Sequence, residues 1–430
     1  MKYIYIGTIN RSGGSLLTRL FDGQQGIASY PLEWDWHLDK KLYPFYVALP
    51  GAPTYIPEYS PLINKNALEF HGLLEEKEEV VHKWGKEKSD SIGVRKNYLE
   101  KSFYQNIKTN FDYQQYVSDI KTKSLDAKSL KDIYDIKHQA YFDAWDHGMD
   151  LEKISHVTWN DSNGLFLNNI DDYFNEFQGS TFVHPIRDIF GYISSEKTRI
   201  TRRFYGSRRF QRGVKMPNFF VKNFHNYDID ALIRCWNVSV TRAVLLQEKY
   251  GVDSDFIVYR YENLLTDTET VMKYICEKNN IEFTNNFLNP TLMGESWGGN
   301  SHQGKQDGVN ANLASYYDKV LSQNEIDKIN ANCGKLVEYL SKSKETPIDL
   351  TKIPKHFLFD YDYQKKYFVD NEKMSLYLAF AFSNMRKVNV MPPNIFSIMA
   401  FAYSKIVRIM HIPRIIKLNL FPGIGRQNYT

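Results

Sequence analysis

Short apolar runs alternate with helical periodicity along most of this chain. Five runs of four to six residues are typical of buried strands, at 3–8, 27–30, 154–159, 181–186 and 256–259. Apolar positions recur at helical spacing over 16–21, 165–174, 190–200, 230–249, 264–278 and 323–340. This alternation predicts an α/β fold, a three-layer parallel sheet with helices on both faces.

Two regions lack the alternation. Residues 64–150 are rich in Lys, Glu, Asp and Tyr with helical periodicity, which predicts a helical insertion. From residue 349 onward the strand pattern is lost. The chain is therefore predicted to consist of a main domain, 1–348, and a basic amphipathic helical tail, 349–430.

Composition and charge narrow the choice of class. The chain has 430 residues, 43% of them hydrophobic and 24% charged, which excludes a disordered, collagenous or coiled-coil protein. The net charge of +4 is too small to indicate a nucleic-acid partner. Residues 373–430 carry eight basic residues and no acid; subtracting these from +4 leaves −4 on residues 1–372. Such a tail suits packing on the body, a homodimer contact or peripheral contact with an anionic membrane.

The sequence shows no pattern typical of a metal site, a signal peptide or a membrane-spanning helix. Cys235, Cys276 and Cys333 lie far apart without a C-x-x-C pair, so neither a disulfide framework nor a metal site is predicted. We find no signal-peptide pattern and no apolar stretch of about 20 residues. A cytoplasmic location is therefore expected, with the tail as the part that would reach a membrane.

The loop between the first predicted strand and helix has the features of an anion site. It reads Gly7-Thr8-Ile9-Asn10-Arg11-Ser12-Gly13-Gly14-Ser15-Leu16. Small residues let successive N–H groups point at one anion, and the following helix N-terminus favours negative charge. The loop has no Walker lysine and no dinucleotide spacing, which argues against an ordinary ATPase or NAD enzyme. The simpler interpretation is a glycine-rich turn that only caps a helix.

A second cluster follows the predicted strand 181–186. Arg187 comes at its carboxyl end, where open α/β sheets bind ligands. Ser195 and Arg199 are four residues apart and share a helix face. The alternative is a solvated basic helix, since several more arginines follow.

Together these segments resemble the PAPS-dependent sulfotransferases. The resemblance spans residues 3 to about 342 and rests on five stretches in order: Arg11-Ser12-Gly13, Arg187 to Ser195, Tyr261–Asp267 (YENLLTD), Asn280–Phe283 (NIEF) and Gly294–Ser301 (GESWGGNS). It implies a P-loop NTPase-like sulfotransferase fold. It also implies transfer of a sulfuryl group from PAPS, the co-substrate, to an acceptor hydroxyl without a metal.

The resemblance also implies roles for individual residues. The 5′-phosphosulfate would be held by Arg11, Ser12, Gly13, Gly14, Ser15 and Leu16. The 3′-phosphate would be held by Arg187, Ser195 and Arg199, and a loop containing Trp297, Gly298 and Ser301 would close over the nucleotide. Tyr261 and Glu262 are expected to brace the sheet.

For catalysis, Arg11 is suited to stabilise the developing negative charge. Glu33 is the expected general base, with His37 as the second choice, because both follow the second strand. His184 is a further candidate but lies within a buried strand, which favours a structural role. Many family members carry a lysine after the third strand, whereas this chain has Asn160 and Ser162 there.

The acceptor is the least defined part. Aromatic residues near Glu33 and the 64–150 insertion, placed on the acceptor side, favour a glycan or glycolipid hydroxyl. The missing lysine leaves open a catalytically weak, sulfotransferase-like nucleotide-binding protein. Another P-loop-like kinase or transferase is the remaining alternative.

Overall fold

We describe a computed structural model of the chain. The description covers residues 1–33, 115, 118–119, 122–123, 130–144, 151–161, 170–204, 222, 229–292, 294–297, 308–310 and 317–366. Of the predicted insertion, 64–150, it therefore includes one helix and a few further positions, and of the predicted tail only residues 349–366.

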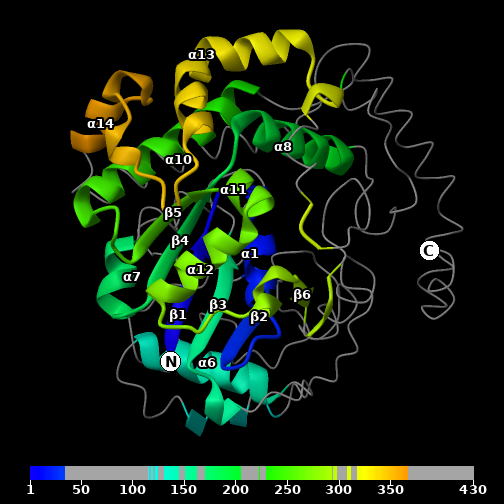
Figure 1. Cartoon of the computed structure of the whole chain (residues 1–430), viewed down its shortest axis with the longest axis vertical. Coiled ribbons are helices and arrows are strands. Elements are labelled where there is room, and N and C mark those ends of the chain that lie inside the picture. The colour runs from blue at the N-terminus through cyan, green and yellow to red at the C-terminus, as the bar shows by residue number, and fades with distance from the viewer. Residues whose placement is uncertain are drawn as a thin grey trace, which may run out of the picture.

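The sheet has five parallel strands, which confirms the predicted α/β architecture (Figure 1). The strands are β1 (Lys2–Gly7), β2 (Ile27–Glu33), β3 (His156–Asp161), β4 (Thr181–Ile186) and β5 (Phe256–Arg260). Their order is β2-β3-β1-β4-β5, so the first strand of the chain lies in the centre. Every strand that the apolar runs predict is present.

Helices connect and cover the strands. They are α1 (Gly14–Phe21), α6 (Leu130–Asp143), α7 (Ile170–Glu176), α8 (Ile189–Phe204), α10 (Ile229–Tyr250), α11 (Tyr261–Thr266), α12 (Thr268–Lys278), α13 (Gln323–Lys342) and α14 (Tyr361–Lys366). A hairpin of β6 (Thr291–Leu292) and β7 (Glu295–Ser296) adds to these, with 3-10 turns at Leu151–Lys153, Asn285–Leu288, Leu350–Lys352 and Lys355–Phe357. Within the described ranges, no helix is long and apolar enough to cross a membrane.

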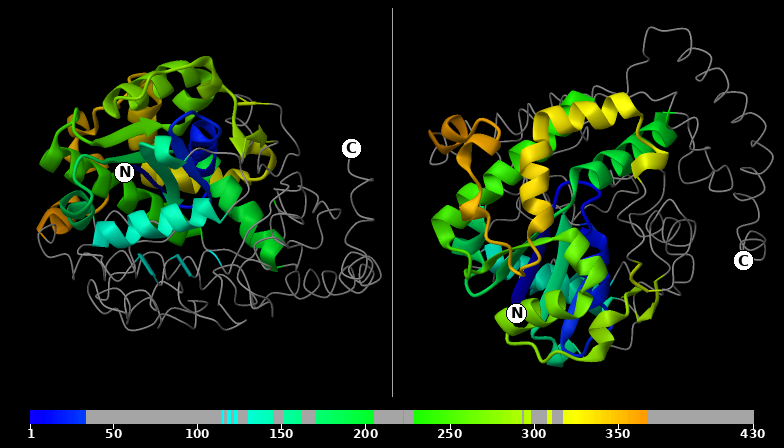
Figure 2. Two further views of the ribbon diagram at one scale, coloured as in Figure 1. Left: turned by 90° about the horizontal axis from the view of Figure 1, so that it is seen from below. Right: turned by 45° about the horizontal axis from the view of Figure 1, so that its top comes forward.

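The two faces of the sheet bury different kinds of side chain. In β1, Tyr3 and Tyr5 join one cluster, whereas Ile4 and Ile6 join the other, as expected for a strand covered on both faces. The first cluster mixes aromatic with aliphatic side chains and includes residues of α6, α7 and α10. The second is largely aliphatic and includes residues of α1, α11 and α12. Figure 2 shows α6 against one face of the sheet.

Strand β2 is longer than the apolar pattern predicts. The sequence suggests that it ends at Pro31, but it runs to Glu33 with a register shift between Ser29 and Glu33. Because β2 lies at the edge of the sheet, a missing N–H at Pro31 costs no ladder hydrogen bond on its outer side. The extension brings the backbone of Glu33 beside Asn160 in β3.

The first part of the predicted tail packs into the body. Leu350 and Ile353 are fully buried in the first of these two clusters, the one that contains Tyr3 and Tyr5. The Gln247 side chain of α10 donates to the Ile348 carbonyl and accepts from the Leu350 N–H, at 2.9 and 2.8 Å. The division that the sequence suggests at residue 349 therefore does not coincide with a break in packing. Residues 367–430 lie outside the described part.

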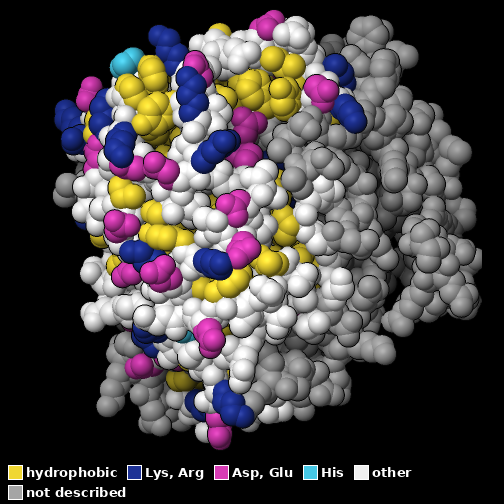
Figure 3. Space-filling model, in the orientation of Figure 1, with side chains coloured by type: hydrophobic (Ala, Val, Ile, Leu, Met, Phe, Trp, Pro, Cys, Tyr) yellow, Lys and Arg dark blue, Asp and Glu magenta, His cyan; other side chains and the backbone are white. Residues whose placement is uncertain are grey.

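Basic and acidic side chains are interspersed over the described part of the face shown in Figure 3.

Candidate anion site at the carboxyl edge of the sheet

The loop between β1 and α1 lies at the carboxyl edge of the central strand. Strand β1 pairs with β3 on one side and β4 on the other, so the order in which the strands follow one another reverses beside β1, which is where open α/β sheets bind ligands. Gly13, the residue before α1, has a φ of 98°. A Cβ atom at Gly13 would lie 2.1 Å from Cδ2 of Tyr261. Only glycine fits this combination of backbone angle and close approach.

The next glycine is also enclosed. A Cβ atom at Gly14 would lie 2.1 Å from Oδ1 of Asn160 and 2.7 Å from Cγ2 of Thr8. The side-chain oxygens of Asn160 and Ser12 are buried and have no hydrogen-bond partner in the structure. A buried polar atom without a partner is uncommon in proteins. The Ser12 hydroxyl is therefore suited to donate to an oxygen of a bound anion.

Three residues that the sequence assigns to two separate anion sites lie together. Nε of Arg11 donates to Oγ of Ser195 at 2.9 Å. A guanidinium nitrogen of Arg187 donates to the backbone carbonyl of Arg11 at 2.6 Å. Arg11 itself has a φ of 68°, in the left-handed region that few residues other than glycine adopt. We call Arg11, Arg187 and Ser195 the anion cluster.

The aromatic ring of Tyr261 packs against the guanidinium group of Arg187 in this cluster. The guanidinium carbon of Arg187 lies 5.0 Å from the centre of the ring, a cation–π distance. The same ring makes the close approach to Gly13. Trp236 of α10 donates its indole N–H to the Arg187 carbonyl at 2.8 Å. Tyr261, which the sequence assigned to bracing the sheet, thus also lies against the loop and Arg187.

The carboxyl groups of Asp188 and Glu262, which follow Arg187 and Tyr261 in the chain, are buried. The Asp188 N–H donates to Oε1 of Glu262 at 3.0 Å, and the Gly191 N–H donates to Oδ2 of Asp188 at 3.0 Å. Burial raises the pKa of both carboxyl groups. Arg260 lies 3.5 Å from Glu262 and opposes this rise.

His184 lies in β4 and is buried. Its Nδ1–H donates to the carbonyl of Gly7, the last residue before the loop, at 2.7 Å. Burial lowers the pKa of His184 to about 4, so the ring is neutral near pH 7. The hydrogen bond ties β4 to the start of the loop, which agrees with the structural role expected for this residue.

The remaining predicted residues are placed only in part. Ser15 and Leu16 form the first turn of α1. Glu33 is placed by its backbone, beside Asn160, and Arg199 by its backbone in α8. Their side chains, and all of His37, Gly298 and Ser301, lie outside the described part.

Trp297 is described and is buried. It is 7% exposed, and the guanidinium carbon of Arg19 lies 6.0 Å from its ring centre. Because Arg19 is in the last turn of α1, Trp297 packs on the side of that helix.

The helix that carries Ser195 also contains a lysine that sequence reasoning did not single out. Lys197 of α8 is fully buried and forms an ion pair with Glu325 of α13. It stands four residues after the buried Ile193, so it occupies the apolar stripe of its helix. A charged residue within the apolar stripe of a helix is the signal that could have identified Lys197. The several arginines that follow in the sequence make this one basic residue hard to distinguish.

No protein-family model matches this chain, and no curated protein matches it. Similar solved structures include two sulfotransferase domains. One is the sulfotransferase domain from the curacin biosynthetic pathway, with 15% identity, a TM-score of 0.39, and coverage of 78% of this chain and 98% of that one. The other is the sulfotransferase domain from the Synechococcus PCC 7002 olefin synthase, with 15% identity, a TM-score of 0.41, and coverage of 80% and 95%.

Both similar structures are sulfotransferase domains, the family that the sequence motifs resemble.

Proposed function

We propose that this protein is a sulfotransferase that uses PAPS as the sulfuryl donor. The observation that carries the proposal is the anion cluster, in which Arg11 meets Arg187 and Ser195, although it lies more than 170 positions before either of them in the chain. Two guanidinium groups and two serine hydroxyls, those of Ser195 and Ser12, gather at the start of α1. Guanidinium groups, hydroxyls and a helix N-terminus are the groups that bind phosphate and sulfate.

The donor fits this arrangement because it carries anionic groups at two positions. Its 5′-phosphosulfate would lie on the loop that contains Ser12 and Gly13. Its 3′-phosphate would lie by Arg187, Ser195 and Arg199. A nucleoside triphosphate such as ATP has no 3′-phosphate. Arg187, Ser195 and Arg199 would therefore have no phosphate group to bind on ATP.

Transfer of a sulfuryl group depends mainly on positioning and on charge stabilisation, as in phosphoryl transfer. Glu33 would accept the proton of the acceptor hydroxyl as that oxygen forms its bond to sulfur. The bond between sulfur and the bridging oxygen breaks, and Arg11 stabilises the negative charge that the nucleotide retains. Asn160 supplies a neutral amide where many family members have a lysine, so Arg11 carries more of the stabilisation here.

The acceptor in this proposal is a carbohydrate or glycoconjugate hydroxyl. The support is the position of Glu33, at the carboxyl edge beside Asn160, next to sequence rich in tryptophan at 34–36. Aromatic faces stack on sugar rings. Transfer of label from radiolabelled PAPS to a panel of glycans, glycolipids and phenols tests this choice, and preferential labelling of phenols would contradict it.

Binding measurements test the use of PAPS. By titration calorimetry, adenosine 3′,5′-bisphosphate should bind more tightly than AMP, and ATP should bind weakly. Arg187→Ala should weaken binding of the bisphosphate by roughly 10- to 100-fold, the value of a charge-assisted hydrogen bond, and leave AMP nearly unchanged. Lys273→Ala, on the exposed surface of α12, is the control.

Three results would argue against the proposal. Equal weakening of both nucleotides by Arg187→Ala would refute the 3′-phosphate role. Tighter binding of ATP than of the bisphosphate would favour a kinase. Normal binding without transfer to any acceptor would favour a nucleotide-binding protein without this activity.

A further inference from the structure

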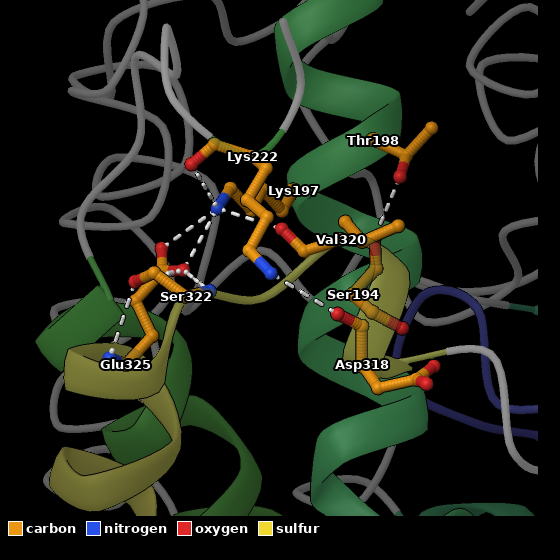
Figure 4. Close-up of polar contacts among 8 residues, drawn as sticks. All are labelled: Ser194, Lys197, Thr198, Lys222, Asp318, Val320, Ser322 and Glu325. Carbon is orange, nitrogen blue, oxygen red and sulfur yellow. Dashed lines mark hydrogen bonds and ion pairs between the residues drawn. The ribbon is translucent and has the colours of Figure 1, made fainter. Parts of the chain in front are cut away.

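The ammonium group of Lys197 is enclosed by four oxygen atoms (Figure 4). It lies 2.9 and 2.8 Å from the two carboxylate oxygens of Glu325, 3.0 Å from the Val320 carbonyl and 3.2 Å from the Lys222 carbonyl. The side chain is 0% exposed. Burial lowers the pKa of Lys197, and the charge of Glu325 opposes this. One buried ammonium thus joins α8 to residue 222 and to the segment 320–325 at the start of α13.

Glu325 has a second role at the start of α13. Ser322 and Glu325 form a capping box, in which the carboxylate accepts from the Ser322 N–H at 2.7 Å. The Ser322 hydroxyl accepts from the Glu325 N–H. The carboxylate that pairs with Lys197 therefore also fixes where α13 begins.

Lys197 and Ser195 point to opposite sides of α8. Residues of an α-helix are about 100° apart, so side chains two positions apart diverge by about 200°. Ser195 points to Arg11, and Lys197 points to α13. Figure 2 shows α13, in yellow, running beside α8. A shift of α8 on the side of α13 would therefore move Ser195 relative to Arg11.

The other end of α13 is tied to the second half of the anion cluster. Arg260 donates to the carbonyls of Ser341 and Ser343, at 3.1 and 3.3 Å, where α13 ends. The same guanidinium pairs with Glu262, which accepts the Asp188 N–H. Asp188 directly follows Arg187. Helix α13 thus connects, through its two ends, to the neighbours of Ser195 and of Arg187.

We propose that the Lys197–Glu325 ion pair is a positioning device that holds Ser195 at the spacing from Arg187 and Arg11 that a 3′-phosphate requires. This inference rests on the proposed function, since it assigns the 3′-phosphate to these residues. Neither Lys197 nor Glu325 touches the nucleotide. Their effect reaches the site through the placement of α8 against α13.

The test uses the full-length protein and two ligands, adenosine 3′,5′-bisphosphate and AMP. The first variant is Glu325→Gln, because glutamine also completes a capping box and removes only the charge. The second is Lys197→Met, which keeps the aliphatic length. Lys328→Met is the matched control, since Lys328 is also on α13 and pairs with Asp230 at the exposed surface. Dissociation constants are measured by calorimetry, and thermal unfolding is recorded for every variant.

We expect Glu325→Gln and Lys197→Met to weaken binding of the bisphosphate by roughly tenfold, the lower end of what removing a group that orients a ligand-binding residue costs. Binding of AMP should change by less than about twofold, since AMP has no 3′-phosphate. The preference for the bisphosphate, measured as the dissociation constant of AMP divided by that of the bisphosphate, should therefore fall by roughly tenfold. Lys328→Met should leave both constants unchanged. A purely structural role would weaken both nucleotides in parallel with the loss of thermal stability.

The possible failures can be told apart. If the wild-type protein does not prefer the bisphosphate over AMP, the proposed function is wrong. If the wild type has this preference and Glu325→Gln retains it, the positioning role is refuted while the proposed function stands. Should Lys197→Met fail to fold, Glu325→Gln alone decides.

Discussion

Replacement of Gly13 by alanine is the sharpest test of the loop geometry. The substitution adds one methyl group at a backbone φ of 98°, which costs an L-residue about 1–2 kcal/mol. The new Cβ would lie 2.1 Å from Tyr261, whereas ordinary contacts begin at 3.4 Å. The ring would have to move by more than 1 Å, and Arg187 lies against it. Overpacking of this kind costs about 1–3 kcal/mol.

The total expected loss in the free energy of unfolding is therefore about 2–5 kcal/mol. Gly251→Ala separates the two contributions, because Gly251 has a φ of 92° and nothing within 4 Å of its added Cβ. That variant should lose only the backbone part, about 1–2 kcal/mol. Urea unfolding of both variants gives the comparison, and calorimetry should show weaker nucleotide binding only for Gly13→Ala. Equal losses of stability would show that Tyr261 does not pack on the loop.

Three further predictions concern the base, a buried histidine and the segment after 348. Glu33→Gln should lower turnover by about 100-fold or more while nucleotide binding stays near normal; unchanged turnover would remove Glu33 as the base. Burial lowers the pKa of His184 to about 4 from 6.5, so the unfolded chain binds a proton in this window that the folded chain does not. Stability should therefore fall as the pH is lowered from 6.5 to 4, by up to about 3 kcal/mol, and urea unfolding of His184→Gln should show a shallower dependence. Leu350→Ala should cost about 2–5 kcal/mol, as for other buried leucines, whereas a loss below 0.5 kcal/mol in urea unfolding would mean that this segment is not part of the core.

The elements of the fold were predictable because the sheet is buried on both faces. Each strand then appears as a short apolar run, as at Thr181–Ile186, where all six residues are buried. The extension of β2 past Pro31 was not predictable, since the tolerance for proline depends on its place at the edge. That place follows from the order of strands, which the local pattern does not contain.

The candidate site was predictable in its parts but not in its assembly. The loop at Arg11 and the pair Arg187 and Ser195 stood out by residue type and by position after a strand. That Arg11 and Ser195 share a hydrogen bond depends on the pairing of β1 with β4, which is long-range. The role of Lys197 was hidden for the same reason, because its partner lies 128 positions away.

The central place of β1 has a consequence for synthesis of the protein. Ile4 pairs with Thr158 in β3 and Thr181 in β4, so β1 leaves the ribosome well before both of its partner strands. At ~5–20 residues per second, β1 waits roughly 10 to 35 s before β4 exists. During this time the run Tyr3–Ile6, which is fully buried in the folded protein, is exposed to water. A short apolar segment of high β-propensity without charge is prone to aggregate. Protection of this strand by a chaperone during synthesis should therefore raise the yield of folded protein.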